Sequence, residues 1–267
     1  MRMLTISRSI STKSDSKKKK NMQNQATNDK FGDSCESDED DLFDDLFKDF
    51  HRREAPVPLF HSREQTIRYC VGIDMGKRKD RTAIAVVEIP YRRPNVARVY
   101  LAKYLQRLEP GLLYTEVAAK VKRLHEQLRE DAEKRGLWCR VTYILDSTGV
   151  GEGVSEMIID ALPHANIRKC YLTGGINPSV DGIQIKLPKT QMASTLLALF
   201  DDGRVKLPKK SKEIEAMVEE LLNYEIHVSE EGHDQYGAFK TGAHDDLVTA
   251  LGLACWYAEY YKRFMFL

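Results

Sequence analysis

IRYCVGID, at residues 67–74, is a short apolar run that ends in Gly and Asp, and it predicts a buried strand. Side chains alternate along a strand, so Asp74 is expected to share one face with Gly72. Apolar runs at 82–89 and 97–108 predict two further strands. The connections between the three are short and polar and contain turn residues, which favours an antiparallel meander.

Helices and strands are expected to alternate after this meander. The predicted helices cover residues 113–135, 151–162, 189–201, 212–222 and 244 to about 263. The predicted strands cover residues 140–146, 167–173, 204–208 and 224–228, with one arm of a small hairpin at 236–241. This order indicates an α/β domain with a mixed sheet, in which three antiparallel strands are followed by parallel strands and flanked by helices. We expect Trp138 and Trp256 in its core.

The composition excludes several classes of protein. Among 267 residues, 41 Lys and Arg nearly balance 40 Asp and Glu, so the strongly basic charge of many nucleic-acid binders is missing, although a local basic face remains possible. No apolar run reaches the roughly 18 residues of a membrane span, and the N-terminus has no apolar signal segment. The five cysteines are scattered, which argues against a disulfide framework or a zinc-binding motif.

The charge is distributed unevenly near the N-terminus. Residues 1–30 hold eight Lys or Arg against two Asp, and residues 31–50 hold nine Asp or Glu against one Lys. Such a polar segment cannot bury enough apolar surface to offset the entropy of ordering it. We therefore expect residues 1–62 to form a disordered tail and residues 63–267 to form the folded domain.

One part of this tail, residues 36–50, combines acidic and apolar residues. On a helix its apolar side chains would form one stripe against an acidic face: Leu42, Phe43, Leu46, Phe47 and Phe50. This pattern is typical of a segment that folds into a groove on a partner. It is also compatible with a solvated acidic tail, or with an acidic mimic of DNA that occupies a basic cleft of its own domain.

Carboxylates follow two of the predicted strands. Asp74 closes the first strand and is followed by Gly76 and by three cations, Lys77, Arg78 and Lys79. A carboxylate at the mouth of a strand beside such a loop suits a metal ion or a phosphate, although Asp and Gly are also ordinary turn residues. Asp146 closes the strand 140–146 in the same way, before a glycine-rich turn that matches neither the dinucleotide nor the P-loop pattern.

Two more carboxylates, Asp245 and Asp246, begin the last predicted helix. One of them can cap that helix, but two adjacent side chains cannot both do so. The other is expected to point toward the sheet, where a carboxylate needs a cation or a proton. Convergence of these separate Asp residues on one site would favour two Mg²⁺ or Mn²⁺ ions over zinc. Such a pair can align water and leaving oxygen at a phosphodiester.

Three stretches together resemble a known family: VGIDMG(x)3DRTA at 71–83, YILDSTGVGEGV at 143–154 and GAHDDLVTALGLA at 242–254. They are similar, in order and in kind, to the nuclease domain of the large terminase subunits of tailed bacteriophages, which has a ribonuclease H-like fold. The resemblance covers roughly residues 68–264. It implies catalytic and metal-binding roles for Asp74, Asp146 and Asp246, with Asp245 as a further metal ligand. It also implies DNA contacts from Lys77, Arg78, Lys79, Lys189 and His244.

The implied function is cleavage of double-stranded viral DNA during genome packaging, with two Mg²⁺ or Mn²⁺ ions, in the cytoplasm of the host cell. The sequence departs from the family because the 62-residue tail stands where a large terminase has its ATPase. We therefore expect a separate packaging ATPase, or another terminase or portal component, to bind residues 36–50. The alternatives are a Holliday-junction-resolvase-like endonuclease and a non-catalytic packaging or assembly adaptor. A sugar-kinase or actin-type ATPase would need more than about 200 folded residues.

Overall fold

The computed structural model describes residues 66–76, 81–91, 96–208, 211–222, 224–228, 234–237 and 245–260, with the backbone alone at 225–228 and 234–237. The predicted tail and its docking segment at 36–50 therefore lie outside the described residues. Within the described part, no helix is long and apolar enough to cross a membrane.

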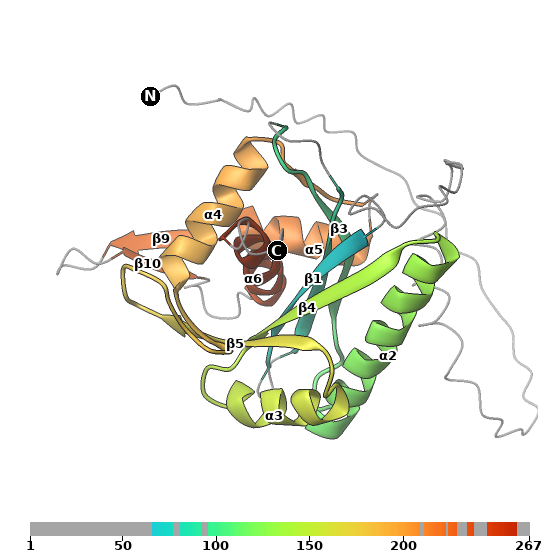
Figure 1. The fold of residues 1–267 in the computed structure, drawn as a ribbon. Coiled ribbons are helices and arrows are strands. Elements are labelled where there is room, and N and C mark those ends of the chain that lie inside the picture. Colours follow the sequence, from blue (N-terminus) through green and yellow to red (C-terminus); the bar gives the residue numbers. More distant parts are fainter. Residues whose placement is uncertain are drawn as a thin grey trace, which may run out of the picture. The chain divides into compact units, whose positions relative to one another are not determined.

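An eight-stranded mixed sheet forms the centre of the described domain, in the order β6-β7-β5-β4-β1-β2-β3-β8 (Figure 1). The predicted antiparallel meander is present as β1 (Thr66–Asp74), β2 (Ala83–Ile89) and β3 (Tyr100–Arg107). Parallel strands then extend it on the other side of β1: β4 (Trp138–Asp146), β5 (Asn166–Thr173) and β7 (Gln184–Pro188). The short strands β6 (Ser179–Asp181) and β8 (Val205–Lys206) lie at the two edges.

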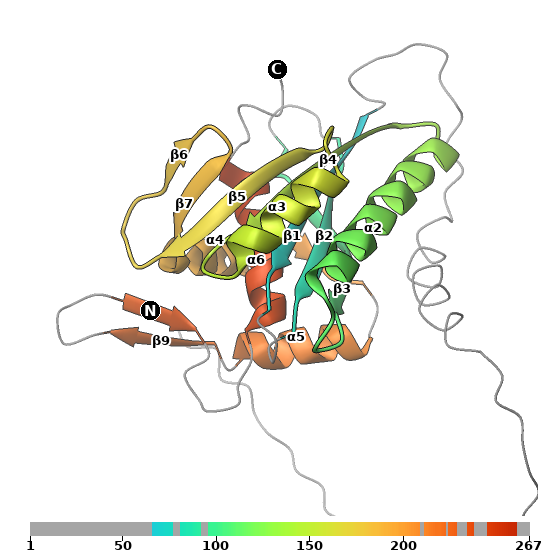
Figure 2. The same cartoon turned by 90° about the horizontal axis from the view of Figure 1, so that it is seen from below.

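Helices cover both faces of this sheet. On one face, α2 (Tyr114–Lys134) and α3 (Gly151–Ala161) lie side by side and pack on the apolar side chains of β1 that include Val71 and Ile73 (Figure 2). The other face carries α4 (Lys189–Asp201), α5 (Lys212–Leu222) and α6 (Asp246–Tyr260). A separate two-stranded sheet pairs β9 (Glu225–Val228) with β10 (Asp234–Gly237). These layers confirm the predicted ribonuclease H-like α/β fold.

Helix α6 is the core of the second face. Every residue from Leu247 to Ala258 is buried, because the helix is enclosed by the sheet, α4 and α5. It lies directly on β1 at Gly72, where a Cβ atom would come within 2.0 Å of the carbonyl oxygen of Ala250 and 2.9 Å of the nitrogen of Ala254. Only glycine permits so close an approach between a strand and a helix backbone.

The structure corrects two parts of the sequence-based description. Trp256 is buried, as predicted, but Trp138 is 64% exposed and the prediction of a core position was wrong. Trp138 begins β4, and because Cys139 and Val141 face α2, strand alternation places Trp138 on the opposite face at the end of the sheet. The hairpin of β6 and β7 was not predicted, although Asp181-Gly182 between alternating apolar residues is a recognised turn signal and Gly182 has a φ of 56°.

Candidate active site

Asp74 and Asp146 come from neighbouring strands that end at the same edge of the sheet. β1 and β4 are parallel, and their register pairs Ile73 with Leu145, so the next residue on each strand is the aspartate. Because Asp74 shares the face of Gly72, its carboxylate lies on the side of the sheet that α6 covers. The predicted convergence of these two strand ends is therefore present.

Helix α6 brings the other two aspartates to this edge. Asp246 precedes Ala250 by four residues, about 6 Å along a helix, and Asp74 follows Gly72 by two, about 6.6 Å along a strand. Gly72 and Ala250 are in contact, and the two distances measured from them are nearly equal. Asp74 and Asp246 therefore lie close together at this edge of the sheet. The charges of Asp146, Asp246 and Asp245 are all close enough to Asp74 to raise the pKa of its carboxyl group.

The pKa of Asp74 lies well above its ordinary value. Burial is the largest cause, followed by repulsion from Asp146, Asp246 and Asp245, and the Lys189 ammonium opposes the shift. Burial also raises the pKa of Asp146, whose Oδ1 accepts a hydrogen bond of 2.9 Å from the backbone N–H of Thr148. The site therefore carries more negative charge than its surroundings stabilise, and a cation or a proton would relieve it.

Two cations of the chain offset part of this charge. Lys189, the first residue of α4, donates from Nζ to Oδ2 of Asp245 at 2.8 Å. Arg107, the last residue of β3, places its Nε 3.9 Å from Oδ2 of Asp246. Lys189 was predicted to face DNA, and the structure places it at the site, whereas no sequence pattern singled out Arg107.

Glu220 of α5 is a second residue that sequence analysis missed. Its buried carboxylate pairs with Arg107 and accepts a hydrogen bond of 2.9 Å from the backbone N–H of Val248, in the first turn of α6. It therefore caps the helix that carries Asp246 and also holds the arginine facing that aspartate. In the sequence Glu220 is one acid among several on an amphipathic helix, so no local signal distinguishes it.

Gly151, in the glycine-rich turn after Asp146, lets the chain approach itself closely. A Cβ atom there would lie 2.0 Å from the carbonyl oxygen of Asp146. The first residue of α3 is thus packed directly behind the aspartate that ends β4.

We expect Gly151→Ala to shift Asp146 and to lower the free energy of unfolding by about 2–3 kcal/mol, as overpacking of a close contact does. Gly153→Ala is the matched control, because it lies in the same helix and its Cβ would meet nothing within 4 Å. Urea unfolding of both variants measures the difference. Equal stability of the two would contradict the close packing behind Asp146.

The carboxylates fit a divalent ion by their chemistry, since oxygen donors are the ligands of Mg²⁺ and Mn²⁺. Among the described residues, however, no three His, Cys, Asp or Glu side chains are arranged to hold a metal ion together. The carboxylate of Asp245 accepts a hydrogen bond from Lys189. An ion would have to replace this contact. Four other predicted site residues lie outside the described part: Lys77, Arg78, Lys79 and His244.

The chain is similar to one protein family and to several solved structures. Residues 71–257 match the family model of the terminase RNaseH-like domain. Among solved structures, the manganese-soaked human cytomegalovirus terminase nuclease domain is similar at 12% identity and a TM-score of 0.47, over 83% of this chain and 95% of that one. Thermus thermophilus RuvC is similar at 13% identity and a TM-score of 0.34, over 73% and 96%. No curated protein sequence matches the chain.

Proposed function

This chain belongs to the family of terminase ribonuclease H-like domains, and we propose that it is a metal-dependent endonuclease that cleaves double-stranded viral DNA during genome packaging. The observation that carries the proposal is the gathering of four aspartates at one edge of the sheet, where burial, and then repulsion among them, raises the pKa of Asp74. A cluster of carboxylates that burial disfavours is typical of a site built for cations.

In this proposal Asp74, Asp146 and Asp246, with Asp245, would hold two Mg²⁺ or Mn²⁺ ions. When bound, the ions would supply charge neutralisation at the phosphodiester and a water of lowered pKa. The protein positions these ligands through rigid elements: two adjacent strand ends and one buried helix. Glu220 and Arg107 hold the start of that helix in place.

Lys189 is proposed to contact the phosphate of the DNA. Its ammonium group neutralises Asp245 in the structure. The same group would become available to an anion if that carboxylate bound a divalent ion. Contacts to DNA from the loop residues Lys77, Arg78 and Lys79 and from His244 remain predictions. Such backbone contacts confer affinity without sequence specificity.

We propose that the chain works in the cytoplasm of the infected cell and receives its DNA from an ATPase motor. This motor, or another terminase or portal component, is proposed to bind the chain.

The alternative, a Holliday-junction-resolvase-like endonuclease, differs in substrate. We expect the full chain with Mn²⁺ to cleave linear duplex DNA and a four-way junction with the same arms at rates within about threefold, because the proposed phosphate contacts are available on both substrates. Gel analysis of both substrates in one reaction measures the ratio. A junction preference of a hundredfold or more would favour the resolvase function. Loss of all cleavage, with metal binding intact, would favour the adaptor.

A further inference from the structure

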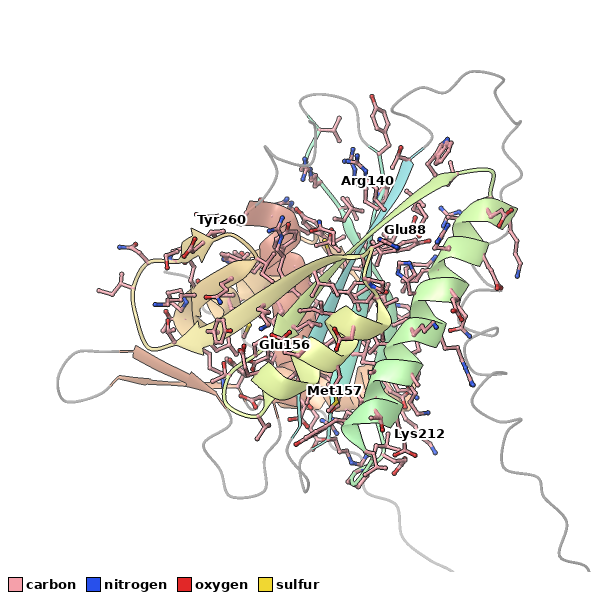
Figure 3. All side chains as sticks on the ribbon, turned by 60° about the horizontal axis from the view of Figure 1, so that its bottom comes forward. Glu88, Arg140, Glu156, Met157, Lys212 and Tyr260 are labelled. Atoms are coloured by element: carbon pink, nitrogen blue, oxygen red, sulfur yellow. The ribbon has the colours of Figure 1, made fainter. Side chains whose placement is uncertain are left out.

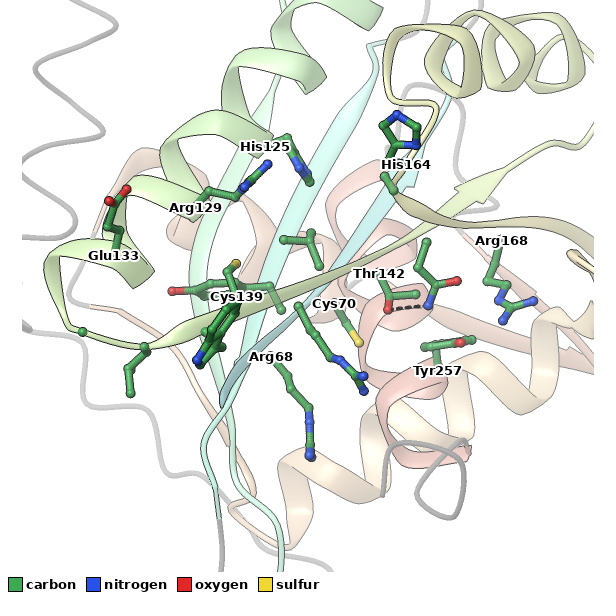
Figure 4. Close-up of a pocket in the computed structure, with 18 residues that line it drawn as sticks. Arg68, Cys70, His125, Arg129, Glu133, Cys139, Thr142, His164, Arg168 and Tyr257 are labelled. Carbon is green, nitrogen blue, oxygen red and sulfur yellow. Dashed lines mark hydrogen bonds between the residues drawn. The ribbon is translucent and has the colours of Figure 1, made fainter. Parts of the chain in front are cut away.

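A basic groove of about 1050 Å³ lies at the end of the sheet opposite the aspartates (Figure 4). The first residues of β1 and β4 line it, together with one side of α2. Asp74 is at the other end of β1, eight residues from Thr66, or about 26 Å along a strand. Figure 3 labels Arg140, which lines the groove, near the start of β4. The groove is therefore distinct from the candidate active site.

Positive charge dominates the lining of this groove, in which Glu133 is the one carboxylate among the described residues. The cationic or titratable basic side chains that line it are Arg68, Arg129, Arg140, Arg168, His125 and His164. Arg68 and Arg140 are paired in register on adjacent strands, so their side chains share one face. Burial and then the charges of Arg98 and Arg140 lower the pKa of Arg68. Like charges held this close favour an anionic ligand.

The groove also offers apolar surface. Trp138, 64% exposed, stands at its edge beside the half-buried Leu137. A duplex presents phosphates outward and keeps its bases stacked inside, so it gives an exposed indole no apolar partner. The ligand that suits the groove therefore combines negative charge with apolar side chains.

One segment of the chain has this combination and is joined to the groove. Residues 39–50, EDDLFDDLFKDF, hold six acids against one Lys and carry the apolar stripe of Leu42, Phe43, Leu46 and Phe47. Fifteen residues separate this segment from Thr66, which is paired in register with Trp138 at the groove. A connection of that length can reach up to about 50 Å, and a short tether gives an effective concentration in the millimolar range.

We propose that residues 39–50 occupy the basic groove of their own chain. The acids neutralise the arginine cluster, and the Leu and Phe side chains cover Trp138. Docking leaves the aspartate site open, since the two lie at opposite ends of β1. The proposal does not depend on nuclease activity, and its test measures binding alone.

The test uses tryptophan fluorescence of the full chain. Trp138 and Trp256 are its two tryptophans, and Trp256 is 1% exposed, so acrylamide quenching reports mainly on Trp138. Docking predicts that the quenching constant rises about twofold in Phe43→Ser/Phe47→Ser, where the apolar contacts are lost. The same rise is expected in Arg129→Glu/Arg140→Glu, whose two arginines are exposed, so that folding is preserved.

Two further variants make the result specific. Lys186→Glu/Lys206→Glu changes the net charge equally at exposed positions outside the groove and is expected to leave quenching unchanged. Adding Asp44→Arg/Asp45→Arg to the groove variant exchanges the charges and is expected to restore protection. Identical quenching in wild type and all variants would overturn the proposal. So would protection that disappears on dilution, which indicates a second copy, or protection that requires an added oligonucleotide.

Discussion

Asp74→Asn is expected to abolish DNA cleavage and, at the same time, to stabilise the metal-free protein. The loss should reach at least about 1,000-fold, which corresponds to about 4 kcal/mol of transition-state stabilisation. The gain in stability follows from the raised pKa of Asp74, which burial and three neighbouring aspartates cause. Asparagine keeps the shape of the side chain and removes the charge that the folded protein disfavours.

The sign of the pH dependence follows from the same shift. The folded protein holds a proton on Asp74 at pH values where the unfolded chain, with a pKa of about 3.9, has already lost it. The contribution of this proton on Asp74 to the free energy of unfolding is therefore complete below about pH 4 and is lost as the pH rises through the folded-state pKa. The gain in stability of Asp74→Asn over the wild type should accordingly be largest at neutral pH and absent in acid.

Thermal unfolding in EDTA at several pH values measures this advantage. A shift of a few degrees is expected, since 1 kcal/mol moves the midpoint by about 2–4 °C in a domain of this size. Saturating Mn²⁺ should raise the midpoint of the wild type and have much less effect on the variant. Asp201→Asn, at an exposed position of α4, is the control and should change neither property. An Asp74→Asn variant that is less stable in EDTA would contradict the electrostatic account.

Gly72→Ala is expected to cause the largest loss of stability of any single methyl added to the domain. The new Cβ would lie 2.0 Å from the carbonyl oxygen of Ala250, and the atom it meets is backbone, which cannot rotate away. The displacement of α6 from β1 should lower the free energy of unfolding by about 3 kcal/mol or more. It should also lower cleavage, because α6 carries Asp246 to the site.

Gly252→Ala provides the matched comparison in the same helix. There the new Cβ would meet the side chain of Met192 at 3.0 Å, and that flexible side chain can move. The better helix propensity of Ala offsets the remaining contact, so a change within about 1 kcal/mol is expected. Urea unfolding of both variants measures the contrast. If Gly72→Ala is as stable as Gly252→Ala, the close packing of α6 on β1 is wrong.

The positions of the aspartates could be predicted from the sequence because each aspartate lies next to a strong local pattern. Asp74 and Asp146 end apolar runs, and parallel strands bring such ends to one edge. The pair at 245–246 precedes a helix whose apolar character marks it as buried. The hairpin at 179–188 also has a turn signal in its sequence, Asp181-Gly182.

Tertiary contacts explain what the sequence did not reveal. Arg107 and Glu220 meet the site from a strand end and a helix far apart in the chain, and nothing near either residue marks the pairing. Trp138 was assigned to the core by its residue type, but it lies at the start of β4, on the face opposite to α2, and is exposed there. Residue type alone does not determine burial at the end of a strand.

Cleavage of supercoiled plasmid by the full chain tests the central claim most directly. Reactions with Mn²⁺, Mg²⁺ or EDTA compare the wild type with Asp146→Asn, whose change removes one charge at the end of β4. The account predicts nicking or linearisation that requires a divalent ion and that falls by about 1,000-fold in the variant. Cleavage that persists in EDTA, or that Asp146→Asn leaves unchanged, would contradict a metal-dependent nuclease built on these aspartates.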